Sequence, residues 1–245
     1  MKSAPEYVLF DLDQTVIPWD TQLLFRNHVL QEENWRCVLT FVFLAFVPFF
    51  KLLGAGQMKR VFHCYLWGIS RQRLDELAES FVEKWLPQVA YPEIVAEIEA
   101  HRAAGRILVL SSASPELWVA KIGEKLGFDH SLGTLFEWGE KVDFFPELTG
   151  ENHKGAEKVR RLESLGITKG YAAYSDSRAD LPMLEICAEK IMVNPLPGMR
   201  ATGEARGWRL MEPARPWSGR ISFGWGCVRQ LWGLFQLEKG GDGKR

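Results

Sequence analysis

The chain has 245 residues, 47% of them hydrophobic and 25% charged, so it can bury the core of one α/β domain of ordinary size. Its formal net charge of −1 gives no reason to expect a nucleic-acid partner, because such binders are usually strongly basic. The four cysteines are far apart and lack CxxC spacing, so the sequence indicates neither a disulfide framework nor a zinc site. We therefore expect a reduced, cytoplasmic compartment by default.

Short apolar runs that end in polar residues predict the strands of a sheet. A continuous apolar run of about four to eight residues is typical of a buried parallel strand, because both faces of that strand are covered. Three runs fit this description, at residues 7–10, 107–110 and 171–174, and a shorter run lies at residues 191–193. Polar residues gather directly after them, and ligands of open α/β sheets bind at the carboxyl ends of the strands. The strand ends are therefore the predicted site.

Segments with helical signals lie between these runs. Helices are expected at residues 93–104, 115–127, 155–165 and 181–188. Pro115 stands where a first helical turn begins, and Ser114 before it is the expected N-cap. Alternating strands and helices predict a Rossmann-like α/β fold, with a parallel sheet that carries helices on both faces.

A long helical stretch without a convincing strand interrupts this alternation after the first strand. We interpret it as an inserted cap. The expected domains are a catalytic core at 1–18 and 93–215, a helical cap at 19–92, an amphipathic segment at 216–237 and a disordered tail at 238–245.

Two apolar segments are unusual for a soluble protein. Residues 37–50 contain no charge, and a run of this length is too short for an ordinary membrane span. It fits either a buried cap helix or dimer seam, or a helix that contacts a membrane. Residues 217–237 combine Trp and Phe with two arginines, a pattern typical of a helix in a membrane interface, although this segment also has the composition to pack against the cap.

The polar residues after the strands supply each part that phosphoryl transfer needs: a nucleophile, charge neutralisation and hydrogen-bond donors. Asp11 is the candidate nucleophile, because carboxylates form aspartyl-phosphates, and Asp13 is the candidate acid and base. Asp176 and Asp180 follow another strand, and Mg²⁺ is often held by one or two carboxylates together with substrate phosphate. Ser112 is a candidate phosphate donor.

Four motifs along the chain resemble those of the haloacid dehalogenase (HAD) superfamily, in the order of that family. FDLDQT resembles motif I, hhhDxDxT, and SSASPE resembles motif II with its strand-terminal serine. KGAEKVRRL resembles the lysine motif III, and YSDSRADLPML resembles the paired acids of motif IV. The motifs span residues 6–195 and are specific together, whereas DxDxT alone is a weak signal.

The resemblance implies a role for each acid of a magnesium-dependent phosphatase. Asp11 attacks phosphorus and ligates the metal. Asp13 protonates the leaving group and then activates water, while its backbone carbonyl binds the metal. Asp176 completes the protein ligands, and Asp180 supports the metal shell or the lysine. The second aspartate favours phosphatase over dehalogenase chemistry, because an ester leaving group needs an acid.

The resemblance also implies the residues that hold the phosphate, namely Thr15, Ser112, Ala113 and a lysine. Lys158 matches the lysine motif better, and Lys154 remains the alternative because it has a comparable position at a helix start. Gln14 departs from the family pattern, in which many members carry glycine. We expect its larger side chain to narrow the entrance to the site.

The position of the cap, SASPE and YSDSRADLPML resemble the phosphoserine-phosphatase-like branch (subfamily IB), which implies a C1-type helical cap. Within it, the apolar and basic cap resembles the C-type phosphatidylglycerophosphate phosphatases, which act on a membrane lipid. The expected function is hydrolysis of a lipid or small-molecule phosphate monoester by a cytoplasmic protein that contacts the inner membrane face through 37–53 and 217–237. The alternatives are a soluble phosphatase of phosphoserine or a similar metabolite and a non-catalytic membrane-associated module. The sequence indicates no oligomeric state.

Overall fold

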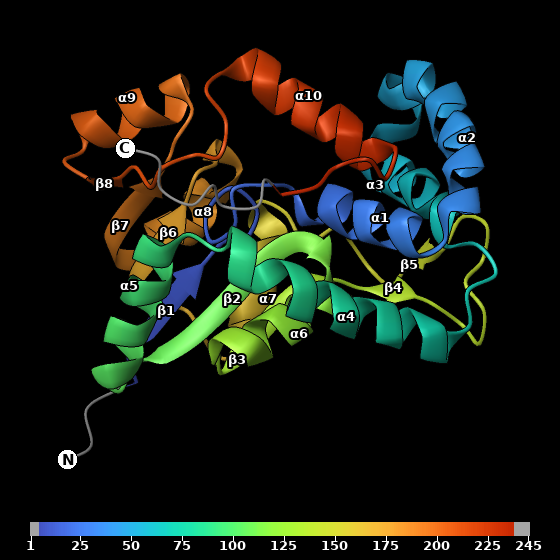
Figure 1. Ribbon diagram of the computed structural model, residues 1–245. Coiled ribbons are helices and arrows are strands. Elements are labelled where there is room, and N and C mark those ends of the chain that lie inside the picture. The colour runs from blue at the N-terminus through green and yellow to red at the C-terminus, as the bar shows by residue number, and fades with distance from the viewer. Residues whose placement is uncertain (1–4, 238–245) are drawn as a thin grey trace.

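Six parallel strands form the central sheet of the computed structural model, which describes residues 5–237 (Figure 1). The strand order is β3-β2-β1-β6-β7-β8, so β1 lies in the middle between β2 and β6. The strands are β1 (Tyr7–Phe10), β2 (Ile107–Pro115), β3 (His130–Thr134), β6 (Gly170–Ser175), β7 (Cys187–Val193) and β8 (Arg209–Met211).

Alternate residues of each strand pack into opposite layers. The helices of the core are α5 (Pro92–Ala103), α6 (Glu116–Leu126), α7 (Ala156–Ser164), α8 (Leu181–Glu185) and α9 (Pro197–Ala205), with the 3-10 turn η4 (Arg178–Asp180). Val8 and Phe10 of β1 belong to one hydrophobic cluster with α5 and α6, whereas Leu9 belongs to a second cluster with α7, α8 and α9. The predicted Rossmann-like sheet with helices on both faces is confirmed.

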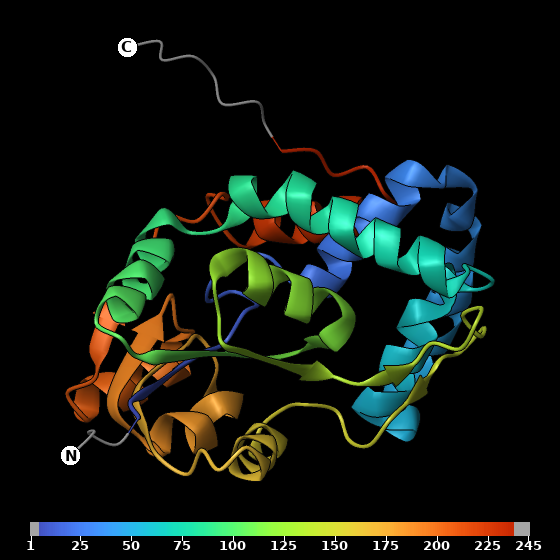
Figure 2. The same ribbon diagram turned by 90° about the horizontal axis from the view of Figure 1, so that it is seen from below.

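The chain between β1 and α5 forms the predicted helical insertion. Its elements are α1 (Thr21–Glu32), η1 (Asn34–Val38), α2 (Leu39–Phe46), η2 (Val47–Phe49), α3 (Phe50–Phe62), η3 (His63–Leu66) and α4 (Arg71–Val89). A hairpin of β4 (Phe136–Glu137) and β5 (Glu147–Leu148) extends from the core and lies beside α3 (Figure 2). Arg60 of α3 fixes it by donating to the carbonyl oxygens of Phe145 and Pro146.

Several elements differ from the sequence prediction. Strands β3 and β8, the β4–β5 hairpin and α9 are not predicted, because none of them has a continuous apolar run or a regular helical pattern. Strand β2 continues past its expected end to Pro115, which is itself the N-cap of α6. The expected disordered tail, residues 238–245, lies outside the described residues.

The apolar segment at residues 37–50 is not buried within the chain. Phe41, Phe49 and Phe50 are more than half exposed, so the prediction of a buried cap helix is wrong for this part. The longer stretch Asn34–Leu66 is apolar and long enough to cross a membrane by length and composition. However, it is broken at η2 and again at Gly54, where the backbone leaves the helical region, and α2 packs against α3. Helix α2 alone spans about 12 Å, less than half of a hydrocarbon core.

The last helix, α10 (Arg220–Leu231), packs against α1 (Figure 1), and Trp232 directly after it meets the ring of Phe41 in α2 edge to face. Trp19 anchors it, stacking on Phe223 and meeting the edge of Phe235. Gly226 allows this close approach, since a β-carbon there would lie 2.6 Å from the Trp19 ring. The opposite side of α10 stays exposed at Ile221, Trp225 and Val228. The segment therefore both packs against the insertion and presents an apolar face.

Candidate active site

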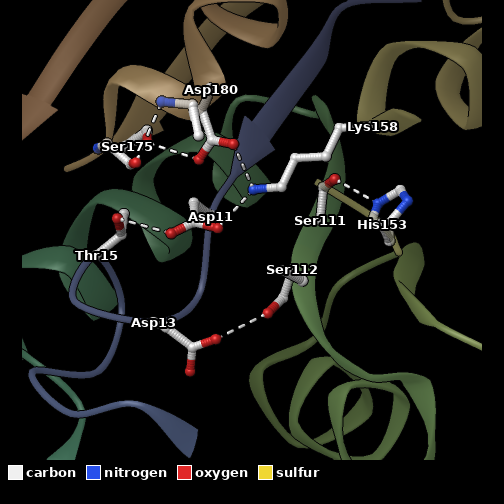
Figure 3. A network of polar contacts seen from close by, with 12 residues as sticks. Asp11, Asp13, Thr15, Ser111, Ser112, His153, Lys158, Ser175 and Asp180 are labelled. Atoms are coloured by element: carbon white, nitrogen blue, oxygen red, sulfur yellow. Dashed lines mark hydrogen bonds and ion pairs between the residues drawn. The ribbon is translucent and has the colours of Figure 1, made fainter. Parts of the chain in front are cut away.

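Asp11 lies at the carboxyl end of the central strand. Its backbone N–H donates to the carbonyl of Tyr174, which extends the ladder between β1 and β6 by one residue beyond Phe10. This bond directs the carboxylate into the edge of the sheet where β2 and β6 also end (Figure 3). The strand pairing thus fixes the position of the candidate nucleophile.

Lys158 of α7 binds this carboxylate directly. Its Nζ lies 2.6 Å from Asp11 Oδ1 and 2.9 Å from Asp180 Oδ1, and the residue is 1% exposed (Figure 3). Burial alone would lower the pKa of Lys158, but Asp11 and Asp180 outweigh it and raise that pKa, so the ammonium stays charged. Burial raises the pKa of Asp11 well above its usual value, and Lys158 opposes this shift.

Two hydroxyl groups hold the acids at the ends of β1 and β6. Thr15 Oγ1 donates to Asp11 Oδ2 and accepts the backbone N–H of Asp176. Ser175 Oγ donates to Asp180 Oδ2 at 2.8 Å, which leaves the other oxygen of Asp180 for Lys158. Asp180 therefore orients the lysine, one of the two supporting roles expected for it.

Asp13 points toward the end of β2. Its Oδ2 accepts from Ser112 Oγ at 3.1 Å and from Ser114 Oγ at 2.7 Å, and its Oδ1 accepts the backbone N–H of Thr21. The expected N-cap role of Ser114 is wrong, because β2 continues through it and its hydroxyl binds Asp13 instead. Both serines are fully buried, so they fix the orientation of the Asp13 carboxylate.

A cavity of about 290 Å³ lies over these groups. Its walls include most of the predicted site residues, namely Asp11, Asp13, Ala113, Lys154, Lys158, Asp176 and Asp180. Thr15 and Ser112 lie behind the wall, hydrogen-bonded to Asp11 and Asp13. Lys154 is exposed at the rim, whereas Lys158 contacts two of the acids, so the structure separates the two candidate lysines.

The cap contributes residues that the sequence pattern did not select. Lys59 Nζ donates to the carbonyl of Ala113 at 2.5 Å and also to Asn152 and Thr134. Burial lowers the pKa of Lys59 to about 8, although Asp20 and Asp13 act in the opposite direction. The signal available in the sequence was a lysine in a cap segment without any acidic residue.

Two further positions shape the site. Gln14 lines the cavity with a left-handed backbone (φ 63°), a conformation that favours glycine, the residue that the motif resemblance implies there. His153 is buried beside Ser111, whose Oγ lies 2.9 Å from Nε2 (Figure 3). Burial lowers the pKa of His153 to about 3, so a neutral imidazole supports the strand end of β2.

The acids of the cavity exceed its cations in number, which suits a divalent metal. Burial, followed by the charge of Asp180, raises the pKa of Asp176 to about 7. Within residues 5–237 no three His, Cys, Asp or Glu side chains form a metal-binding group, and the Asp13 carboxylate is turned toward the serines. A metal there would use the Asp11 and Asp176 carboxylates with the Asp13 carbonyl, as the motif resemblance implies.

Comparison with known proteins identifies the family of the chain. Residues 8–185 match the model of the family described as haloacid dehalogenase-like hydrolase. The chain belongs to this family. It is 34% identical, over 86% of its length and 76% of the relative's, to a protein of Mycobacterium tuberculosis named a probable phosphatase.

Solved structures of similar proteins share the fold. A protein of unknown function from Bordetella pertussis Tohama I matches with a TM-score of 0.70 and 25% identity, over 85% of this chain and 99% of that one. A phosphoserine phosphatase, solved as an analogue of its phospho-aspartyl intermediate, matches with a TM-score of 0.58 and 20% identity, over 87% and 95% of the two chains. The second likeness supports the fold alone.

Proposed function

We propose that this chain hydrolyses phosphate monoesters through an aspartyl-phosphate formed on Asp11. The observation that carries the proposal is the buried ion pair between Asp11 and Lys158, with Asp13 in the same cavity. Burial raises the pKa of the Asp11 carboxyl, and the ammonium at 2.6 Å opposes this shift by favouring the charged, nucleophilic form. Membership of the hydrolase family and the relative named a probable phosphatase support the same activity.

Each residue has a defined role in the proposed reaction. Asp11 forms a bond to phosphorus as the ester bond to the leaving oxygen breaks. Asp13 donates a proton to that oxygen and then takes one from the water that cleaves the aspartyl-phosphate. Lys158 balances charge on Asp11 and the phosphoryl oxygens, while Ser112 and Ser114 keep Asp13 in place.

We propose Mg²⁺ as the cofactor, because hard oxygen ligands and an excess of buried negative charge suit it. When bound, the ion supplies neutralising charge and binds a phosphate oxygen. Its protein ligands would be the carboxylates of Asp11 and Asp176 and the carbonyl of Asp13.

Removal of divalent ions is expected to stop turnover. Treatment with EDTA should reduce hydrolysis of p-nitrophenyl phosphate to background, and added Mg²⁺ should restore it. The thermal midpoint should also rise with Mg²⁺, because a ligand that binds only the folded state stabilises it. Full activity in EDTA, with no change of the midpoint on adding Mg²⁺, would refute the metal requirement.

We further propose that the substrate is a lipid phosphate reached at the inner face of a cytoplasmic membrane. The exposed apolar face, which we define as the outward side chains of α2, η2, α3 and α10, supports this. It comprises Phe41, Leu44, Val47, Phe49, Phe50, Leu52, Ile221, Trp225 and Val228. The surrounding sequence has no Asp or Glu at residues 34–70 or 213–237, but it has Lys51, Arg220 and Arg229. Apolar side chains with basic neighbours are typical of contact with anionic lipids.

A pair of leucine substitutions tests the membrane contact. Leu52→Ser, on the exposed apolar face, is expected to weaken binding to vesicles with anionic phospholipid about ten-fold, the loss expected for one leucine that no longer enters the lipid. Leu196→Ser is the matched control, since Leu196 is 65% exposed, compared with 83% for Leu52, but lies before α9. Equal binding of both variants, or no binding of the wild type, would contradict the proposal.

A side-by-side assay identifies the substrate class. Phosphatidylglycerophosphate, phosphoserine and phosphocholine are compared as substrates, with p-nitrophenyl phosphate as a general one. Preference for the lipid supports the proposal, whereas preference for phosphoserine indicates the soluble metabolite phosphatase. Failure to turn over any of them would favour a non-catalytic membrane-associated module.

A further inference from the structure

A second, apolar cavity lies next to the catalytic one. It has a volume of about 540 Å³, within the range of sites for small organic ligands. Its walls come from α2, α3 and α10, with Phe43, Phe50, Met58, Phe62, Val228 and Leu231 among them. Figure 1 shows these three helices together at one end of the molecule, where α10 approaches the insertion. We call this space the tail cavity.

The tail cavity and the catalytic cavity share a wall. Asp20, Gln22, Ala55 and Lys59 line both of them. Three of these side chains are polar and lie at the junction, while the remainder of the tail cavity is mainly apolar. A molecule with its phosphate near Asp11 can therefore extend its other end past Lys59 into an apolar space.

A buried arginine holds the walls of the tail cavity together. Arg26 of α1 is fully buried and donates from three nitrogens, to the carbonyl of Leu231, the carbonyl of Phe62 and the hydroxyl of Thr40. These acceptors lie on α10, α3 and α2, the helices that form the walls. Because a buried guanidinium is costly unless its donors are satisfied, this arrangement indicates a preformed space rather than loose contact between helices.

We propose that the tail cavity binds a hydrocarbon chain of the leaving group, so that the enzyme selects monoesters of long-chain alcohols. The inference rests on the proposed cleavage of phosphate esters at Asp11. The chain enters between α3 and α10, and the polar junction at Asp20, Gln22 and Lys59 separates it from the phosphate. Acyl lipids and polyprenyl lipids both carry a hydrocarbon chain of this kind.

Cys227 provides a direct readout of occupancy, because it lines the tail cavity and is only half-buried. The wild-type protein is treated with a thiol reagent in alkaline buffer, and modification of each cysteine is followed by mass spectrometry. Non-hydrolysable decylphosphonate is expected to slow modification of Cys227 at least ten-fold, whereas ethylphosphonate should have no effect. Cys37 is also half-buried but does not line the cavity, so its rate should not change. Equal rates at Cys227 with both phosphonates would overturn the inference.

Chain-length kinetics test the same inference through activity. For n-alkyl phosphates, kcat/KM is expected to rise about four-fold for each buried methylene until the cavity is full. Val228→Trp should abolish this rise, so that the ratio of kcat/KM for decyl phosphate to that for ethyl phosphate falls close to one. Leu196→Trp, which adds similar bulk at an exposed leucine outside the tail cavity, should retain the rise. Comparing geranylphosphonate with decylphosphonate distinguishes a polyprenyl chain from a saturated one. The phosphonate that protects Cys227 more strongly carries the type of chain that the tail cavity prefers.

Two outcomes separate the tail cavity from the proposed catalysis at Asp11. Hydrolysis of ethyl phosphate without any preference for longer chains would remove the tail cavity from function and leave the phosphatase intact. Protection of Cys227 by decylphosphonate in a protein that hydrolyses no monoester would leave the binding site and remove the proposed catalysis.

Discussion

Replacing Asp11 with asparagine is expected to abolish turnover, lowering kcat by about 10⁴-fold or more, the scale seen when a covalent nucleophile is removed. Asparagine has nearly the same shape as aspartate, but its amide does not form the aspartyl-phosphate. Hydrolysis of p-nitrophenyl phosphate at saturating Mg²⁺ measures the effect. Activity near that of the wild type would remove Asp11 from the proposed role.

The fold should survive this substitution, which makes the result interpretable. Lys158 keeps its contact with Asp180 at 2.9 Å, so it is not left without a partner. Burial disfavours the charged form of Asp11. Replacing Asp11 with asparagine removes this cost of burying a charge, and it also removes the ion pair to Lys158. Circular dichroism and urea unfolding should therefore change little. Asp143→Asn is the matched control on an exposed aspartate and should retain full activity.

Replacing Lys158 with methionine is expected to lower kcat about 10²- to 10³-fold, the cost of losing one preorganised electrostatic contact. It should also reduce the free energy of unfolding by about 3–5 kcal/mol, because buried carboxylates lose their counter-charge. Asp11 and Asp180 would then repel each other at the end of the sheet. Activity assays and urea unfolding at neutral pH measure the two effects.

The pH dependence of this loss of folding stability follows from the protonation of the buried carboxyl groups. The pKa of Asp176 is already raised to about 7 with Lys158 present, and loss of that positive charge should raise it further. The destabilisation is present when the acids are ionised and is lost as they bind protons. Below about pH 7 Asp176 is protonated in both folded proteins, so the stability difference that it contributes should shrink as the pH falls from alkaline values toward about 7.

Lys154→Met is the matched control for this experiment. Lys154 lines the same cavity but is exposed, and no ion pair joins it to Asp11 or Asp180. Its substitution should change kcat less than three-fold, about the size of an exposed ion-pair effect. A larger loss in Lys154→Met than in Lys158→Met would reverse the assignment of the lysine.

The sequence predicts the centre of this fold better than its edges. Strands β1, β2, β6 and β7 are buried by other elements, so their apolar runs are continuous and easy to find. Strand β3 reads His-Ser-Leu-Gly-Thr and β8 has three residues, and both are outer strands that need less apolar surface. Pairing with the neighbouring strand, rather than composition, determines their structure.

The same contrast holds for the site. Asp11, Asp13, Asp176 and Asp180 follow strands whose order along the chain was predictable, and their motif spacing was specific. The role of Lys59 depends on where the insertion places α3 relative to Ala113, which lies 54 residues away in sequence. Ser114 was expected to cap a helix, but the extension of β2 turned it toward Asp13. Such contacts between distant segments have no periodic signal in one sequence.

Trapping the phosphorylated enzyme tests the central claim most directly. The protein is mixed with a phosphate monoester and Mg²⁺, quenched in acid, and treated with borohydride, which reduces an aspartyl-phosphate to homoserine. Mass spectrometry of the peptides is expected to find homoserine at position 11. Reduction at another acid, or turnover without any trapped acyl phosphate at position 11, would contradict Asp11 as the residue that receives the phosphoryl group.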